Sequence, residues 1–477
     1  MASLSYEEAA HLLRRAGFGG TPEEISDLSS RGREGAVDFL IDFGQIDNSA
    51  MDSLLTASFD FSNPLANDAK FNQNEIRRWW LTRMATTKRQ FEEKITLFWH
   101  NHFATSINKV SGNNGLFMFN QNKLLRDNAL AKFDDLLLKV AQDPAMLIWL
   151  DGLTNVLGKP NENFGRELQE LFTMGINDVV TGQQNYTEDD VKQIARAFTG
   201  WDYQRTSPFT FRINANQHDN GTKTIYGQPG NFSGQDVITM ISARPATARY
   251  LTWKLFNFFV YPVTGSDADK STIEHFAKLY LNNDHSIKEL VRAIFTSDEF
   301  FSDRAFFSLV KQPVEFVVGA VRMLGGTYNP GSTVSTPPRT STELQTSSRN
   351  MGQDLLNPPD VSGWDFNLGW VNTASMLERF NFANRYINNR ITNAPGVFVT
   401  NDQLKSITRG SSKKTVKRFL SRLGPLSVGD ALLTLRTYLE TGDNGQPVTY
   451  VNDDATVDKK IRGLVHQILS LPEFQLN

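Results

Sequence analysis

Hydrophobic positions along the chain recur mostly at helical spacing. Val37, Leu40 and Ile41 lie at i, i+3 and i+4, which is the repeat of an amphipathic helix. Thr21 followed by Pro22 indicates a helix start, because threonine caps the N-terminus of a helix and proline fits its first turn. The same patterns predict further helices at residues 5–16, 72–87, 88–103, 120–141, 161–174, 187–199, 234–242, 244–260, 270–282, 285–298, 311–324, 373–391, 413–422, 428–439 and 456–470.

Strand signals are few. Residues 209–213 and 223–226 are predicted to pair as a hairpin around the turn signal Asn220-Gly221. Residues 326–350 are rich in Ser, Thr, Pro and Gly, which predicts a long loop. We therefore expect a mainly α protein, a single large multi-helix domain with a small β-hairpin and long loops.

The composition and the missing motifs exclude several classes of function. The 49 basic and 52 acidic residues give a net charge of −3, so binding of nucleic acid through a global positive field is not expected. The chain has no cysteine, which excludes thiolate nucleophiles, disulfides and Cys-ligated metal sites. Phosphate-binding glycine loops and the Gly-x-Ser-x-Gly and His-Glu-x-x-His motifs are also missing from the sequence. Any chemistry must come from histidines and carboxylates.

The first residues do not read as a targeting segment. Glu7, Glu8, Arg14 and Arg15 interrupt what would have to be an apolar stretch, so we expect neither a signal peptide nor a transmembrane segment there. The compartment stays open between a cytoplasmic protein and an exported one whose leader has been removed.

The richest polar motif spans residues 161–175. On a helix, Asn163, Glu167 and Glu170 share one face at i, i+4 and i+7, and Arg166 lies beside them. Two carboxylates one turn apart can act as an acid and base pair, bind a divalent metal, or simply hold an arginine. The sequence leaves these alternatives open.

A second motif, Phe-Trp-His-Asn-His-Phe, spans residues 98–103. His100 and His102 lie at i and i+2, so they point to different sides of a helix and do not chelate one metal. A core position is the commoner outcome for His102. His100, flanked by Trp99 and Asn101, is the better candidate for a cleft.

Two loops carry further candidates. His218, Asp219 and Lys223 fall close together in a polar loop, which fits an acid–base or metal cluster as well as ordinary surface polarity. Asp360 and Trp364 belong to the sequence Asn-Pro-Pro-Asp-Val-Ser-Gly-Trp, where two prolines and a glycine fix the backbone. That rigid loop suits either a ligand wall or a lock between parts of the fold.

Taken in order, the motifs resemble the bacterial family catalogued as domain of unknown function 1800. The resemblance spans about residues 4–475 and rests on motifs at residues 12–19, 98–103, 162–171, 186–201, 218–219 and 357–364. It implies one family-length unit, and it implies no reaction. Many members of that family resemble exported proteins, a pattern from which this chain departs because it lacks a visible leader.

The unit is expected to have two parts. Residues 1–390 form a helical core that carries all the motifs, and residues 391–477 form a C-terminal helical extension packed on the same unit.

The leading functional hypothesis is a helical hydrolase that acts on a glycan or a related polymer. Glu167 and Glu170 supply the carboxylate chemistry, and His100 and the His218–Asp219 pair carry protons. The residues expected to bind the polymer are Trp99, Asn101, Asn163, Arg166, Trp201, Lys223, Asp360 and Trp364.

Two alternatives to the hydrolase hypothesis remain open. In the first, Glu167, Glu170 and a histidine ligate Mn, Fe or Zn, although the sequence requires no cofactor and assigns no metal ligand. In the second, the protein is a non-catalytic binding or assembly protein whose polar motifs lock helices together. A polysaccharide is the expected partner, nucleic acid is not, and the oligomeric state stays open.

Overall fold

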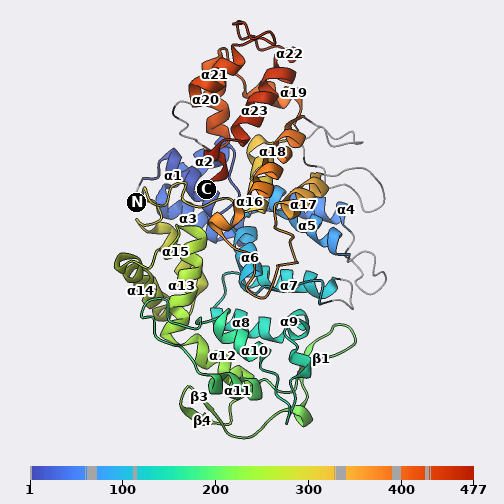
Figure 1. Ribbon diagram of the computed structural model, residues 1–477, viewed down its shortest axis with the longest axis vertical. Helices are drawn as coiled ribbons and strands as arrows, with labels where there is room; N and C mark the ends of the chain where they lie inside the picture. Colours follow the sequence, from blue (N-terminus) through green and yellow to red (C-terminus); the bar gives the residue numbers. More distant parts are fainter. Residues whose placement is uncertain are drawn as a thin grey trace.

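The computed structural model describes residues 3–59, 61, 72–110, 115–326, 328, 340–388, 399–424, 429 and 431–477. The molecule is elongated, with the N-terminal helices near its middle, residues of the central third at one end and the C-terminal helices at the other (Figure 1). It is a mainly helical single domain, as predicted. No helix among these residues is long and apolar enough to cross a membrane.

The helices of residues 6–102 lie in the middle of the molecule (Figure 1). They are α1 (Tyr6–Arg15), α2 (Pro22–Ser30), α3 (Gly32–Ile41), η1 (Phe43–Gln45), α4 (Ser49–Ser58), α5 (Gln73–Thr86) and α6 (Gln90–His102). Ser5 and Thr21 each close a capping box on the helix that follows. Almost every residue of α6 is buried, so this helix lies at the centre of the fold.

One end of the molecule is built from short helices and small sheets. The elements are α7 (Leu116–Asp127), α8 (Phe133–Gln142), α9 (Pro144–Trp149), η2 (Gly152–Thr154), α10 (Asn163–Glu170), α11 (Glu188–Ala197), β1 (Trp201–Tyr203), β2 (Phe211–Ile213), η3 (Ala215–Gln217), β3 (Lys223–Ile225), β4 (Gln228–Gly230) and α12 (Gly234–Ser242). Three helices then flank the centre (Figure 1), namely α13 (Pro245–Phe259), α14 (Asp267–Asn282) and α15 (Ile287–Thr296).

The remaining elements run from the centre to the opposite end. They are α16 (Pro313–Leu324), α17 (Thr340–Asn350), η4 (Asn367–Trp370), α18 (Thr373–Asn388), α19 (Asn401–Ile407), α20 (Ser412–Arg422), α21 (Ala431–Leu439), α22 (Asp454–Thr456), the π-helical turn η5 (Val457–Ile461), α23 (Arg462–Leu469) and η6 (Pro472–Gln475). Helix α23 packs on α18, which joins this end to the core. The boundary near residue 390 stays a prediction.

The predicted hairpin pairing is wrong. Strand β2 pairs with β1, and β3 pairs with β4 through a two-residue turn at Tyr226-Gly227. Both turn residues have positive φ, at 49° and 77°, as a tight hairpin turn of the mirror-image type requires. The Asn220-Gly221 signal instead forms part of a loop in which Asp219 accepts a hydrogen bond from the Gly221 N–H.

Two further segments differ from the prediction. The helix expected over residues 120–141 is two helices, because α7 ends at Asp127 and the Asn128 side chain donates to the Leu124 carbonyl at its end. Within the loop expected over 326–350, residues 340–350 form α17, while 327 and 329–339 lie outside the described residues. The Ser and Thr residues of α17 suggested a loop, but four of the six are buried, and α17 packs against α5 and α16.

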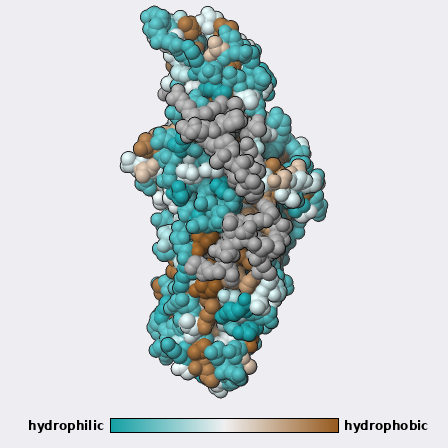
Figure 2. All heavy atoms as spheres, turned by 90° about the vertical axis from the view of Figure 1, so that its right-hand side faces the viewer, coloured by the Kyte–Doolittle hydropathy of each residue, from teal (hydrophilic) through white to brown (hydrophobic). Residues whose placement is uncertain are grey.

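The N-terminal motif at residues 12–19 ties α1 to the centre. Arg15 donates to the Ala305 carbonyl and to Ser308, and the Lys94 ammonium donates to the Gly17 carbonyl at 3.0 Å. Lys94 also forms a buried ion pair with Glu315. On the face shown in Figure 2, most of the surface is hydrophilic, and the larger apolar patches lie in the lower half of the molecule. The buried apolar side chains of the described residues form one dominant cluster.

Candidate functional site

The C-terminus of α6 is clamped to the segment 354–364, which we call the strap. The Asn101 Oδ1 accepts a hydrogen bond from the Trp364 backbone N–H at 2.7 Å, and its Nδ2 donates to the Trp364 carbonyl at 3.3 Å. Gly363 has a φ of +86°, and a Cβ on it would lie 2.2 Å from the Asn101 Oδ1. Only glycine fits at this contact. Two predicted binding residues therefore meet, although they are far apart in the sequence.

His100 holds the strap from inside the core. It is buried, and its Nε2 accepts a hydrogen bond from the Leu356 N–H at 3.0 Å. The ring also packs edge-on against Trp80. Burial, and secondarily the charge of Arg77, lowers the pKa of His100 to about 3. The ring is therefore neutral and structural in this geometry, and its role as a proton carrier stays a prediction.

An ion pair and further hydrogen bonds hold the rest of the strap. Arg77 forms an ion pair with Asp354 at 2.9 Å, and the Asn357 Oδ1 accepts from Ser106 at 2.7 Å. Asp360 accepts from both the backbone N–H and the hydroxyl of Ser362, which closes a local turn. The strap motif thus acts first as a lock between distant segments, one of the two roles expected from its sequence.

A small cavity of about 70 Å³ opens where α6, α13 and the strap meet, and we call it the strap cavity. Its walls are mainly aromatic, with a few polar side chains and two basic ones. The lining residues are Phe98, Asn101, His102, Trp253, Lys254, Asn257, Phe258, Ser362, Trp364 and Phe366. None of these side chains is acidic.

His102, rather than His100, lines this cavity. It is 7% exposed, and its Nε2 donates to the Phe172 carbonyl at 3.0 Å. Burial, together with the nearby charge of Lys254, lowers the pKa of His102 to about 3, so the ring is neutral. Its Nδ1 is then an acceptor, and among the described residues it has no hydrogen-bond partner.

Lys254 is the charged group of the strap cavity that sequence reasoning missed. Its ammonium lies 5.4 Å from the centre of the Tyr250 ring and 5.8 Å from that of Trp253. It forms no ion pair with any carboxylate of the described residues, and burial lowers its pKa. The available signal was that Lys254 is the one charged residue in the aromatic run 250–259.

The polar motif of α10 binds this helix to α11. Arg166 donates to both carboxylate oxygens of Glu188 at 2.8 Å and to Glu162 at 3.2 Å. A Cβ on Gly165 would lie 3.3 Å from backbone atoms of α11, so glycine permits the close helix packing. Asn163 donates to Asp151 at 3.2 Å.

The two predicted catalytic carboxylates lie on the same side of α10. Glu170 accepts a hydrogen bond from the Tyr186 hydroxyl at 3.3 Å. Glu167 is half-buried, and burial together with the charge of Glu170 raises its pKa. Neither residue lines the strap cavity. Their catalytic roles stay a prediction.

The loop at residues 217–223 forms a separate cluster. Asp219 is paired with Arg196 of α11 at 2.7 Å, which helps to lower its pKa. The His218 Nδ1 lies 2.8 Å from the Thr199 carbonyl oxygen, and the Lys223 ammonium donates to the Asp219 carbonyl. These bonds fasten the loop to α11, and the polymer-binding role of Lys223 stays a prediction.

The three tryptophans expected to stack on a sugar are all largely buried. Trp99 is fully buried and donates from its indole to the Ala129 carbonyl. Trp201 packs between Phe198 and Phe211. Of these three tryptophans, only Trp364 lines the strap cavity.

Comparison with known proteins gives a family and no activity. A family model described as protein of unknown function, DUF1800, matches residues 11–476. The chain belongs to the DUF1800 family. It matches no curated protein and no solved structure at a significant level. The resemblance drawn from the motifs is therefore confirmed, over nearly the whole chain.

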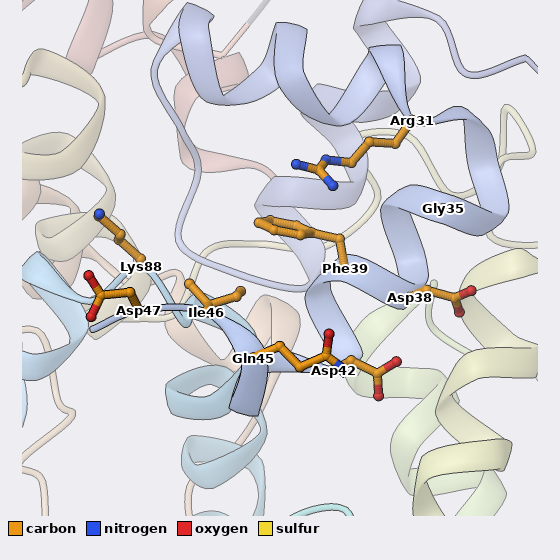
Figure 3. A pocket seen from close by; sticks show the side chains of 9 residues that line it. All are labelled: Arg31, Gly35, Asp38, Phe39, Asp42, Gln45, Ile46, Asp47 and Lys88. Carbon is orange, nitrogen blue, oxygen red and sulfur yellow. The ribbon is translucent and has the colours of Figure 1, made fainter. Parts of the chain in front are cut away.

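This DUF1800 protein has two larger cavities beside α2 and α3, which sequence reasoning did not indicate. One of about 510 Å³ is lined by Arg31, Gly35, Asp38, Phe39, Asp42, Gln45, Ile46, Asp47 and Lys88 (Figure 3). A second of about 350 Å³ shares Phe39, Ile46 and Lys88 with it. Asp38 and Asp42 point away from Phe39 in Figure 3, and they are paired with Arg292 and Lys288 of α15. The acidic rim is thus largely neutralised by the protein itself.

The described residues offer no ready set of ligands for the metalloenzyme alternative. Among the described residues, no three His, Asp or Glu side chains are grouped so that they could hold a metal ion. Apart from Trp99 and Trp201, which pack in the core, the predicted site residues lie in three places, at the strap, on α10 and in the loop at 217–223.

Proposed function

We propose that this DUF1800 protein is a binding protein that takes the acidic group of an anionic ligand into the strap cavity. The observation that carries the proposal is Lys254, a partly buried cation that lines a cavity and has no carboxylate partner among the described residues. The proposal extends the non-catalytic hypothesis, since the strap motif and the α6 motif together build the walls.

The energetics favour an anion. A buried charge without a partner costs free energy, and a counter-charge in a low-dielectric site recovers part of that cost. Lys254 is partly buried among aromatic side chains, and the lower local dielectric there strengthens the attraction. No acidic side chain of the lining competes for the ammonium. An entering anion therefore meets a preformed positive site.

The size of the cavity limits what enters. A volume of about 70 Å³ is several times the roughly 10–15 Å³ that one water-sized probe occupies. A carboxylate with its first carbon atoms is small enough for this space. The body of the ligand then stays outside, against Phe366 and Ser362 at the edge of the strap.

Ligand-observed NMR tests the proposal with acetate and phenylacetate as probes. We expect saturation transfer to both probes, and loss of the transfer in Lys254→Met. Lys278→Met is the matched control, because Lys278 is an exposed lysine on α14. Absence of transfer, or equal transfer in Lys254→Met and the wild-type protein, would contradict the proposal.

Glycan hydrolysis is the second candidate. The observation that favours it is the raised pKa of the half-buried Glu167, since a general acid must hold its proton near neutral pH. In this scheme Glu167 protonates the leaving group and Glu170 is the second carboxylate. Screening diverse glycans with the wild-type protein and Glu167→Gln tests it, and activity that is unchanged in the variant would exclude Glu167 as the acid.

The metalloenzyme alternative has a direct test of its own. Elemental analysis of the purified protein measures bound Mn, Fe and Zn. Close to one equivalent that is lost in Glu167→Gln would support a site at Glu167 and Glu170, whereas a trace amount counts against it.

A further inference from the structure

An exposed apolar surface begins at the edge of the strap cavity. Among the described residues, eleven large apolar side chains are exposed, and five of them fall within residues 366–380. These five, which we call the apolar surface, are Phe366, Leu368, Val371, Leu377 and Phe380, with exposed fractions from 37% to 73%. They are close together in the chain, and a group of exposed apolar side chains indicates an interaction site, whereas single ones do not.

The backbone that carries this surface is held in place. Trp370 is buried against Val310 and Trp364, and the Ser375 hydroxyl donates to the Trp370 carbonyl at 2.8 Å. Asn367 accepts a hydrogen bond from the Val310 N–H at 2.9 Å. The apolar surface is therefore preformed, and a partner does not have to order it.

Phe366 connects this surface to the strap cavity. It lines the cavity and is also 44% exposed, so one side chain belongs to both features. A ligand that leaves the cavity past Phe366 reaches the apolar surface next. The two features together describe a ligand with one acidic group and an adjoining apolar part.

The charges around the surface disfavour an anionic membrane as the occupant. Arg379 is the one basic residue within 366–380, and it is fully buried and donates to the Lys311 carbonyl. Asp365 beside Phe366 is exposed. Peripheral membrane binding relies on exposed basic side chains, which this segment lacks. Lys254, inside the cavity, is the positive group that a ligand meets.

We propose that the strap cavity and the apolar surface together dock the carboxyl-terminal end of a partner polypeptide. The proposal rests on the anion-binding function proposed above. The terminal carboxylate pairs with Lys254, and the last apolar side chains lie on Leu368, Val371 and Leu377. A terminal carboxylate fits the small cavity, and an extended chain suits an open surface better than a buried tunnel.

Selection from a library tests this proposal. Random peptides displayed with free carboxyl termini are selected on the full-length protein, with Lys254→Met as the counter-target. We expect enrichment of peptides whose last residues are apolar. No enrichment over the Lys254→Met counter-target overturns the proposal.

A synthetic copy of the most enriched peptide then separates the two parts of the site. We expect the free acid to bind at least about tenfold more tightly than the C-terminal amide, because only the acid pairs with Lys254. In Lys254→Met, the affinity for the free acid should fall to that for the amide. Equal affinity of acid and amide for the wild-type protein overturns the proposal.

Surface variants complete the design. Leu368→Ser should weaken the acid and the amide alike, whereas Leu433→Ser, at another exposed leucine that lies on α21, should change neither. If acetate binds at Lys254 but no peptide is enriched, the proposed anion site is supported and the docking proposal is contradicted. If sedimentation shows that the apolar surface pairs two copies of the chain, the docking proposal also falls.

Discussion

Glu93 on α6 and Lys254 on α13 are both charged groups in apolar surroundings, yet their environments are opposite. Glu93 is fully buried and accepts four hydrogen bonds, two from Arg126 at 2.9 Å, one from Arg83 at 2.8 Å and one from Trp80 at 2.9 Å. Lys254 has no ion-pair partner among the described residues, and it faces a cavity. A fully paired buried charge supports the fold, whereas an unpaired charge beside a cavity is what the proposed anion site requires.

The protonation of the two groups reflects this difference. Burial alone would raise the pKa of Glu93, but the two arginines outweigh burial and lower it to about 2. No carboxylate opposes burial at Lys254, so its pKa falls. Removing each charge should therefore have opposite consequences for stability.

The largest effect is expected for Glu93→Gln. The variant leaves Arg126 and Arg83 buried without their counter-charge, which costs about 3–5 kcal/mol of unfolding free energy. Because the folded-state pKa lies below the unfolded one, the wild-type contribution is present above pH 4.5 and is lost as the pH falls towards 2. Urea unfolding at pH 7 measures the loss.

Glu92→Gln is the matched control for that measurement. Glu92 is the neighbouring residue, and its nearest arginine nitrogens are 3.7 and 4.0 Å away. Its pKa is raised by burial, so losing the charge should cost less than about 1 kcal/mol. Equal losses in the two variants would contradict the role given to Glu93.

Asp143 is an intermediate case, a buried carboxylate that has amide donors and no cation. Burial raises its pKa to about 7, although it accepts hydrogen bonds from Gln121 and from the Met146 N–H. The unfolded chain loses this proton first, so stability should fall as the pH rises from 4 to 7.

Asp143→Asn keeps an acceptor at the cap of α9 and removes the charge. We expect it to be more stable than the wild-type protein at pH 8 by on the order of 2–4 kcal/mol, and equally stable at pH 4. Thermal unfolding at the two pH values measures the difference. A constant difference between the two proteins at both pH values would show that Asp143 does not titrate in this range.

Lys254→Met should leave the fold intact. Removing this unpaired and partly buried charge is expected to change the unfolding free energy by about 1 kcal/mol or less, with stabilisation more expected than loss. Because the folded-state pKa of Lys254 lies below 10.5, wild-type stability should rise with pH as the pH approaches that value, and this part of the rise should vanish in the variant. Chemical unfolding from pH 7 to 10 measures it. A loss as large as that of Glu93→Gln would make Lys254 structural.

The smallest effect is expected for Glu188→Gln, which breaks the bidentate pair with Arg166. Glu188 is largely exposed, so water and salt screen the pair. We expect no change in the melting temperature beyond experimental error at high salt. A clear loss there would mean that the contact between α10 and α11 depends on this pair.

Much of the fold could be predicted from the sequence because its signals are local. The capping box at Thr187 and Asp190 begins α11, and the pattern of Val37, Leu40 and Ile41 lies within α3. Local signals also misled, because the Ser- and Thr-rich residues of α17 are helical through packing against α5 and α16. Helix propensity is a weak preference that tertiary contacts override.

The candidate site was also predictable only where its signals are local. The sequence by itself selected Asn101 and Trp364 as binding residues and limited any chemistry to histidines and carboxylates. It did not show which of the charged residues Glu93 and Lys254 would have a counter-charge in the folded protein. Only the tertiary structure brought arginines to Glu93 and left Lys254 beside a cavity, because the partner of a buried charge comes from another part of the chain.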